Sequence, residues 1–336
     1  MSNKNVNIIS TGVYHPTKVI HNDYYIEHFK KLGVDITGLL EFTGRRQKLV
    51  CEANETIIDM GYLAAKQALV KANISMDEID MVIFATDTPE YTAPSNALKV
   101  HEKLGGKTDS IVFDINSNCV GMITAMEVAS GYMKSNKRIN KALIIGSQNV
   151  YSFARPDDAI TYSCFGDAGA AIILESTIEE ETKGYIDSIT VTDSTHHTMA
   201  SMPICGYSKI NDDSISKEDK MWWTDPNFNG NFIIDMWSQM VKDVTKRNNI
   251  SVHNVDHFFF SQFCLTHITE TLKKLDVANS SDKYTFVGDE YGYNGVAGPI
   301  VALNRALESG VVKKGSTIVL CTVGSGFTTT LLLWKL

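Results

Sequence analysis

Apolar and polar positions follow the same order in two separate stretches of the chain. The segment that begins at Ile57, IIDMGYLAAKQALVKANISMDEIDMVIFATDT, aligns without a gap with IIDMWSQMVKDVTKRNNISVHNVDHFFFSQF, which begins at Ile233. The IIDM tetrads, the NIS triplets and the aspartate before each strand all keep one offset of 176 residues (233 minus 57). Each copy predicts an amphipathic helix, a short turn and a buried strand, and the constant offset indicates an internal duplication.

The remaining strands and the chain length favour an α/β fold in two halves. KALIIGS (141–147) and STIVLCTV (316–323) are apolar at nearly every position and alternate with helices, which is typical of sheets covered on both faces. The 336 residues exceed the usual size of one domain. We therefore predict two duplicated βαβ-rich halves, 1–175 and 176–336, packed about a pseudo-dyad into a five-layered α/β body.

The second half carries a more polar stretch at about 190–231, which we interpret as an insertion. Its aromatic and methionine residues favour either of two interpretations, a cover over an apolar ligand channel or the simple packing of a long loop.

One short motif carries candidate chemistry. FDINSNCVGM (113–122) predicts a buried strand, a polar triplet and then Cys119 at the start of an apolar helix. The positive end of a helix lowers the pKa of a thiol, and its free amides stabilise an oxyanion. The pattern therefore predicts a readily ionised nucleophile, and the alternative is an inert, packed thiol.

Composition excludes several other classes of protein. A net charge of −8 argues against a nucleic-acid or anionic-membrane binder, and no run approaches the roughly 18 apolar residues of a spanning helix, so we expect a cytoplasmic protein. Six cysteines without a CxxC pair predict neither disulfides nor zinc. His196 and His197 lack a third ligand at useful spacing, and VGSGFTT lacks the last glycine of GxGxxG, so we expect no metal and no cofactor.

Several motifs together resemble the β-ketoacyl-acyl-carrier-protein synthase III family of the thiolase superfamily, nearly end to end. They are STGVYHPTKVIHND, FTGRRQK, TDTPEYTAPS, FDINSNCVGM, FGDAGAAIIL, LTHITETLKKL, EYGYNGVAGPI and VGSGFTTTLLLW. The resemblance implies a homodimeric thiolase fold, five-layered αβαβα, and thioesters of acyl carrier protein or coenzyme A as substrates. It also implies that Cys119 accepts the acyl group and that the amides of Cys119 and Ser325 form the oxyanion hole.

The chain departs from this family at the residues that stabilise the enolate in decarboxylative condensation. Counting back from LKKL places Ser261 where the family has histidine, and a serine hydroxyl does not titrate near neutrality. The family's asparagine corresponds either to Tyr293 or, after a shift of one residue, to Asn294. Glu90, near the cleft, is a candidate base in place of the histidine.

Other positions bear on the acyl donor and the acyl chain. Gly38, Phe42 and Ala159 stand where relatives that use acyl-CoA carry a tryptophan and two arginines, so the adenine clamp is missing. The resemblance places Lys273 and Lys274 on the surface that faces acyl carrier protein. It also places Ala93 at the position where family members have a bulky residue, which crosses the dimer interface and closes the bottom of the acyl pocket. We infer a longer or bulkier acyl group from this small residue.

Two hypotheses follow. The first is a ketosynthase III-like acyltransferase of specialised, polyketide or fatty-acid-derived metabolism, acylated on Cys119 and passing the acyl group to a carbon, oxygen or nitrogen nucleophile. The second is a catalytically reduced partner subunit, which would form a heterodimer with an active homologue.

Overall fold

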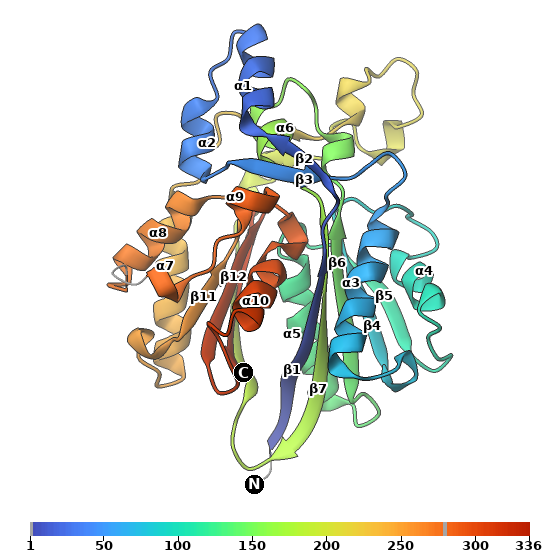
Figure 1. The fold of residues 1–336 in the computed structure, drawn as a ribbon, viewed down its shortest axis with the longest axis vertical. Coiled ribbons are helices and arrows are strands. Elements are labelled where there is room, and N and C mark those ends of the chain that lie inside the picture. The colour runs from blue at the N-terminus through green and yellow to red at the C-terminus, as the bar shows by residue number, and fades with distance from the viewer. Residues whose placement is uncertain (1–2, 278–280) are drawn as a thin grey trace.

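A computed structural model describes residues 3–277 and 281–336. The chain forms two α/β halves that share one nine-stranded sheet (Figure 1). The first half contains β1 (Asn3–Tyr14), α3 (Ile57–Ala72), β4 (Met81–Ala85), α4 (Asn96–Lys103), β5 (Ile111–Ile115), α5 (Gly121–Ser135), β6 (Lys141–Gln148) and β7 (Ala168–Glu179). The second half contains β8 (Gly184–Thr192), α7 (Phe232–Arg247), β11 (His257–Phe260), α8 (Leu265–Lys274), α9 (Gly288–Tyr291), α10 (Gly298–Glu308), β12 (Thr317–Gly324) and β13 (Thr328–Lys335).

Smaller elements cover the end of the molecule where the site lies. They are β2 (Lys18–His21), α1 (Asn22–Lys31), α2 (Thr37–Thr43), β3 (Gln47–Val50) and α6 (Ala159–Cys164), together with β9 (Ala200–Ser201) and β10 (Trp223–Thr224). Strands β2 and β3 pair with each other, and β9 pairs with β10, outside the large sheet.

The predicted duplication is confirmed by the positions of the elements. Strands β11 and β12 begin 176 residues after β4 and β6, the same offset that separates the two IIDM tetrads. Helix α7 begins at Phe232, one residue short of that offset from α3. The start of α3 is fixed by a capping box. The Thr56 hydroxyl accepts from the Asp59 amide, and the Asp59 carboxylate accepts from the Thr56 amide.

The five predicted layers are present. The sheet order is β11-β12-β13-β8-β1-β7-β6-β4-β5, and the halves meet where β1 runs parallel to β8 at Val6 and Gly184. Helices α5 and α10 lie between the halves and pack into one core with strands of both. Helix α3 covers the outer face of the first half, and α7 and α8 cover that of the second (Figure 1). The layer order is therefore αβαβα.

The boundary between the halves differs slightly from the prediction. Strand β7 continues past residue 175 to Glu179, so the chain passes between the halves in the turn before β8. Residues 193–231, between β8 and α7, form the expected excursion, which includes β9 and β10. Within the described residues, no helix is long and apolar enough to cross a membrane.

Asp167 joins the elements that lead into the site. Its buried carboxylate accepts the backbone N–H of Cys51 and of Val150 at 2.9 Å, and that of Tyr151 at 3.2 Å. We expect Asp167→Ala to lower the free energy of unfolding by about 3 kcal/mol or more, because the substitution leaves buried donors unpaired. Urea denaturation of Asp167→Ala beside the exposed control Asp213→Ala measures this, and equal stability of the two variants would contradict it.

Candidate active site

Five residues from both halves meet at the end of the sheet where β4, β5 and β11 terminate. Asp87 follows β4 and Cys119 follows β5, and these two strands are parallel neighbours, so both residues lie at the carboxyl ends of their strands. Ser261 follows β11, Tyr293 precedes α10, and Ser325 lies in the turn between β12 and β13. Carboxyl ends of parallel strands are where α/β folds place ligand sites.

The loop that carries Cys119 is held by its asparagines. The Asn118 amide donates to Oδ1 of Asn116 at 3.1 Å, and Asn118 adopts a left-handed φ of +51°, which asparagine tolerates better than most residues. Its side chain donates to the carbonyl oxygen of Ser325 at 2.7 Å. The NSN triplet therefore forms the turn and ties it to the β12–β13 hairpin.

Gly324 allows the hairpin to approach the nucleophile loop closely. A Cβ atom at Gly324 would lie 3.1 Å from Cβ of Asn118 and 3.5 Å from the backbone nitrogen of Cys119. The backbone of the hairpin thus lies directly against the nucleophile loop, and Ser325 and Cys119 line the same cavity. This arrangement is compatible with an oxyanion hole formed by their amides, which remains a prediction.

The expected easy ionisation of Cys119 is wrong. Helix α5 begins at Gly121, so Cys119 lies ahead of the first turn rather than in it, and it is only 6% exposed. Burial raises the pKa of the Cys119 thiol well above its usual range, and the neighbouring Asp87 carboxylate raises it further. A hydrogen bond from Tyr293 lowers this pKa only in part. The resting thiol is therefore protonated.

The thiol belongs to a chain of hydrogen bonds. Cys119 Sγ donates to Oδ2 of Asp87 at 3.8 Å, and the Tyr293 hydroxyl donates to the sulfur. Ser261 in turn donates to the Tyr293 hydroxyl at 3.3 Å. Burial raises the pKa of Tyr293 well above its usual range and raises that of Asp87 to about 6. At neutral pH, Tyr293 is therefore a neutral donor and Asp87 an ionised acceptor.

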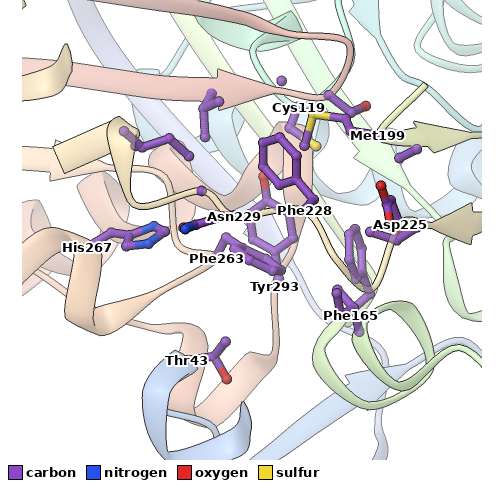
Figure 2. Close-up of a pocket in the computed structure, with 18 of the residues that line it drawn as sticks. Thr43, Cys119, Phe165, Met199, Asp225, Phe228, Asn229, Phe263, His267 and Tyr293 are labelled. Atoms are coloured by element: carbon purple, nitrogen blue, oxygen red, sulfur yellow. The ribbon is translucent and has the colours of Figure 1, made fainter. Parts of the chain in front are cut away.

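A cavity of about 430 Å³ opens beside the sulfur, and most of its wall is apolar (Figure 2). Figure 2 shows Cys119, Phe165, Phe228 and Tyr293 around the same space. Residues of the predicted insertion form much of the wall: Met199, Ala200, Trp222, Thr224, Asp225, Phe228, Asn229, Gly230 and Asn231. Of the two interpretations of this segment, the structure favours the cover over an apolar channel.

His267 lines the end of the cavity that faces Phe42. The two rings meet edge to face at 5.4 Å, and burial lowers the pKa of His267 to about 4, so the imidazole is neutral at physiological pH. Among the described residues no group of three or more His, Cys, Asp or Glu side chains has the geometry of a metal site.

Comparison with known proteins agrees with this geometry. The family model of 3-oxoacyl-(acyl-carrier-protein) synthase III matches residues 113–194, and the model of its C-terminal part matches residues 245–336. A β-ketoacyl-(acyl-carrier-protein) synthase III of Campylobacter fetus is 32% identical over 328 residues, which cover 97% of this chain and 96% of the relative. The chain belongs to the 3-oxoacyl-(acyl-carrier-protein) synthase III family. It is accordingly an acyltransferase.

Solved structures support the fold. The synthase III of Aquifex aeolicus superposes with a TM-score of 0.85 at 24% identity, covering 99% of this chain and all of the other. A priming β-ketosynthase of a polyketide biosynthetic pathway superposes with a TM-score of 0.88 at 19% identity, covering 100% and 98%. At these identities the likeness shows the fold alone, which is the predicted thiolase fold.

The structure decides which residue near the synthase III asparagine position faces the site. Tyr293 lines the cavity, whereas Asn294 is fully buried and its side-chain nitrogen donates to the carbonyl oxygen of Tyr291 at 3.3 Å. Asn294 therefore holds the backbone before α10 and is not among the residues that line the cavity. Ser261 reaches the sulfur only through Tyr293.

Glu90 is a poor candidate for the base within its own chain. It is exposed, three residues beyond Asp87, and is not among the residues that line the cavity. Ala93 is also exposed, in the segment between β4 and α4, so it does not floor the cavity of its own chain. The role expected for Ala93 across a dimer interface remains a prediction.

The positions expected to contact the acyl donor carry few free charges. Phe42 lines the cavity, and Gly38 faces open space. Ala159 is the first residue of α6. At the end of α8, Lys274 forms an ion pair with Asp235, and Lys273 lies 3.5 Å from Glu270 with its side chain 70% exposed. Lys273 is therefore the more available of the two lysines for an acidic partner.

Proposed function

We propose that Cys119 takes an acyl group from an acyl-carrier-protein or CoA thioester and passes it to a carbon, oxygen or nitrogen nucleophile in specialised metabolism. The observation that carries the proposal is a buried thiol that opens into a largely apolar cavity of about 430 Å³, directly against the hairpin that carries Ser325. A cavity of this size and lining suits an acyl chain more than a polar metabolite.

The chemistry of the first step follows from the site. The acyl chain would lie along Phe165, Trp222 and Phe228, which brings the thioester carbonyl to the Cys119 sulfur. Attack by the sulfur forms a tetrahedral oxyanion, and backbone amides at Cys119 and Ser325 are the donors we expect to stabilise it. Collapse of this intermediate releases the carrier thiol and leaves an acyl thioester on Cys119.

The second step is expected to differ from decarboxylative condensation. An enolate is best stabilised by a charged or well-placed donor, and the site offers the neutral hydroxyls of Tyr293 and Ser261 instead of an imidazole. A missing donor of this kind reduces stabilisation by about 3 kcal/mol. An acceptor with its own reactivity, such as an amine or an activated methylene, therefore suits the site better than a malonyl thioester.

A second copy of the chain is the expected partner of β5. This strand is at the edge of the nine-stranded sheet, and its apolar residues Ile111, Val112, Phe113 and Ile115 are only partly buried. An edge strand of this composition is normally covered. Pairing across β5 would produce the homodimer that the family resemblance predicts.

The alternative proposal is a partner subunit with reduced catalysis. The serine at position 261, where the family has histidine, favours a partner subunit. The hydrogen bonds from Asn118 to the Ser325 carbonyl oxygen and from Cys119 to Asp87 favour an active thiol. Intact-mass spectrometry after mixing with acyl-carrier-protein and acyl-CoA thioesters of several chain lengths separates the two. A mass gain equal to one acyl group supports the enzyme, and no gain with any donor supports the partner subunit.

A further inference from the structure

The proposed acyl transfer requires a proton acceptor that the family histidine does not supply here. Cys119 is buried and protonated at rest, so an acceptor must remove its proton as the sulfur attacks. Ser261 and Tyr293 are hydroxyl groups that donate toward the sulfur, and Glu90 lies outside the cavity. The remaining group in contact with the sulfur is the Asp87 carboxylate.

Asp87 is placed to receive that proton. Its Oδ2 accepts from Cys119 Sγ at 3.8 Å, and its Oδ1 is buried without a hydrogen-bond partner among the described residues. No lysine, arginine or histidine of the described chain forms an ion pair with it. A carboxylate that is largely shielded from water and has no neighbouring cation is costly, and such groups are concentrated at functional sites.

A purely structural role does not account for Asp87. The turn after β4 is already fixed by its threonines, because the Thr88 amide donates to the Thr86 hydroxyl at 3.1 Å. The Thr88 hydroxyl in turn accepts from the Asn149 amide at 3.0 Å. The side-chain contact that the structure gives Asp87 is the thiol.

We propose that the Asp87 carboxylate is the general base that accepts the Cys119 proton during acylation, a role that rests on the proposed acyl transfer. The S–H bond breaks as the bond from sulfur to the thioester carbon forms, and the proton moves to Oδ2. When the tetrahedral intermediate collapses, the carbon–sulfur bond to the carrier breaks and the departing thiolate takes the proton from Asp87. The carboxylate is regenerated, so the step balances without another reactant.

The pH dependence of acylation follows from the same contact. The titratable groups that face Asp87 are Cys119 and Tyr293, and Tyr293 stays neutral. Burial raises the pKa of Asp87 to about 6, so the carboxylate accepts protons above that pH and loses this capacity below it. We expect the rate of Cys119 acylation to fall about tenfold for each pH unit below 6 and to level off above 7.

The decisive variant is Asp87→Asn, because the two roles of the carboxylate predict opposite signs. As a general base, its loss is expected to slow acylation by acyl carrier protein about 10²-fold or more at pH 7.5. As a bystander charge, its loss would make the thiolate easier to form and would speed acylation. Asp213→Asn, an exposed carboxylate of the insertion, serves as the matched control with an unchanged rate.

Two readouts keep the test decisive. The acylation rate of Asp87→Asn is expected to rise about tenfold for each pH unit from 7.5 to 9, because hydroxide then removes the thiol proton in place of the carboxylate, and this rise also shows that the variant is folded. A rate equal to or above that of the unmodified protein at pH 7.5 would overturn the proposal. If the unmodified protein takes no acyl group from any donor, the proposed function fails. The pH profile of Cys119 alkylation by iodoacetamide then still tests Asp87, and a profile with no inflection near pH 6 would overturn its role.

Discussion

Replacing Cys119 with alanine is expected to abolish the acyl adduct entirely, a loss of at least about 10³-fold in any acyl transfer that the protein performs. Alanine removes the nucleophile while leaving a small apolar side chain at a position that is only 6% exposed. Intact-mass spectrometry with acyl carrier protein and acyl-CoA donors, followed by product analysis, measures the effect.

Cys205→Ala is the matched control for this substitution. Cys205 is only partly buried and lies in the insertion, where its thiol contacts the carbonyl oxygen of Gly206. Because Cys205 is more accessible than the buried cysteines, its thiol would be the first to react nonspecifically. Cys205→Ala is expected to keep the full adduct. An adduct that survives in Cys119→Ala and disappears in Cys205→Ala would show that Cys205, and not Cys119, accepts the acyl group.

The second large effect is expected from Tyr293→Phe. The ring packs against Phe165 at 5.0 Å and Phe263 at 5.2 Å between ring centres, and phenylalanine preserves both contacts. The substitution removes the hydroxyl that donates to the Cys119 sulfur and would donate to the substrate carbonyl. Loss of one such donor is expected to lower the rate of acyl transfer about 10²-fold to 10³-fold.

Single-turnover kinetics with a fixed acyl donor measures this effect, and Ser261→Ala provides the comparison. Ser261 contacts the sulfur only through the Tyr293 hydroxyl, so its loss should reorient one donor and slow transfer by about tenfold, the usual effect of one neutral hydrogen bond. Equal rates for Tyr293→Phe and the unmodified protein would remove Tyr293 from the reaction. A larger effect from Ser261→Ala than from Tyr293→Phe would show that the Ser261 hydroxyl, and not that of Tyr293, acts directly on the reacting atoms.

The architecture was accessible from the sequence because duplication leaves a periodic trace. The constant offset between the blocks at Ile57 and Ile233 predicted equivalent helices and strands, and both the helix starts and the five layers are confirmed. The predicted boundary at 175 falls within β7, a long strand whose polar end, from Glu175 onward, has the composition of a linker.

The chemistry of the thiol was less accessible. The pattern around Cys119 indicates a helix start, but the pKa of a thiol depends on burial and on neighbours that are distant in sequence. Asp87 is 32 residues away along the chain and contacts the sulfur because β4 and β5 are adjacent parallel strands. The one signal in the sequence was that each residue closely follows a strand rich in apolar residues. Glu90, three residues after Asp87, is exposed and is not among the residues that line the cavity, and its position in the sequence did not distinguish it from Asp87.

The cavity also depended on tertiary structure. Composition of the insertion left open whether its aromatic residues cover a channel, because Trp222 packs against Phe165, which lies 57 residues earlier in the chain (222 minus 165). Such pairings have no periodic trace. The structure resolves the question by placing the insertion over the Cys119 sulfur (Figure 2).

The most direct test of the account is a crystal structure of the protein after reaction with a stoichiometric acyl-carrier-protein or acyl-CoA thioester. We expect continuous density from Cys119 Sγ into the cavity lined by Phe165, Trp222 and Phe228, with the thioester carbonyl oxygen directed at the amides of residues 119 and 325. An unmodified Cys119 with the acyl chain bound elsewhere, or attached to another cysteine, would contradict it.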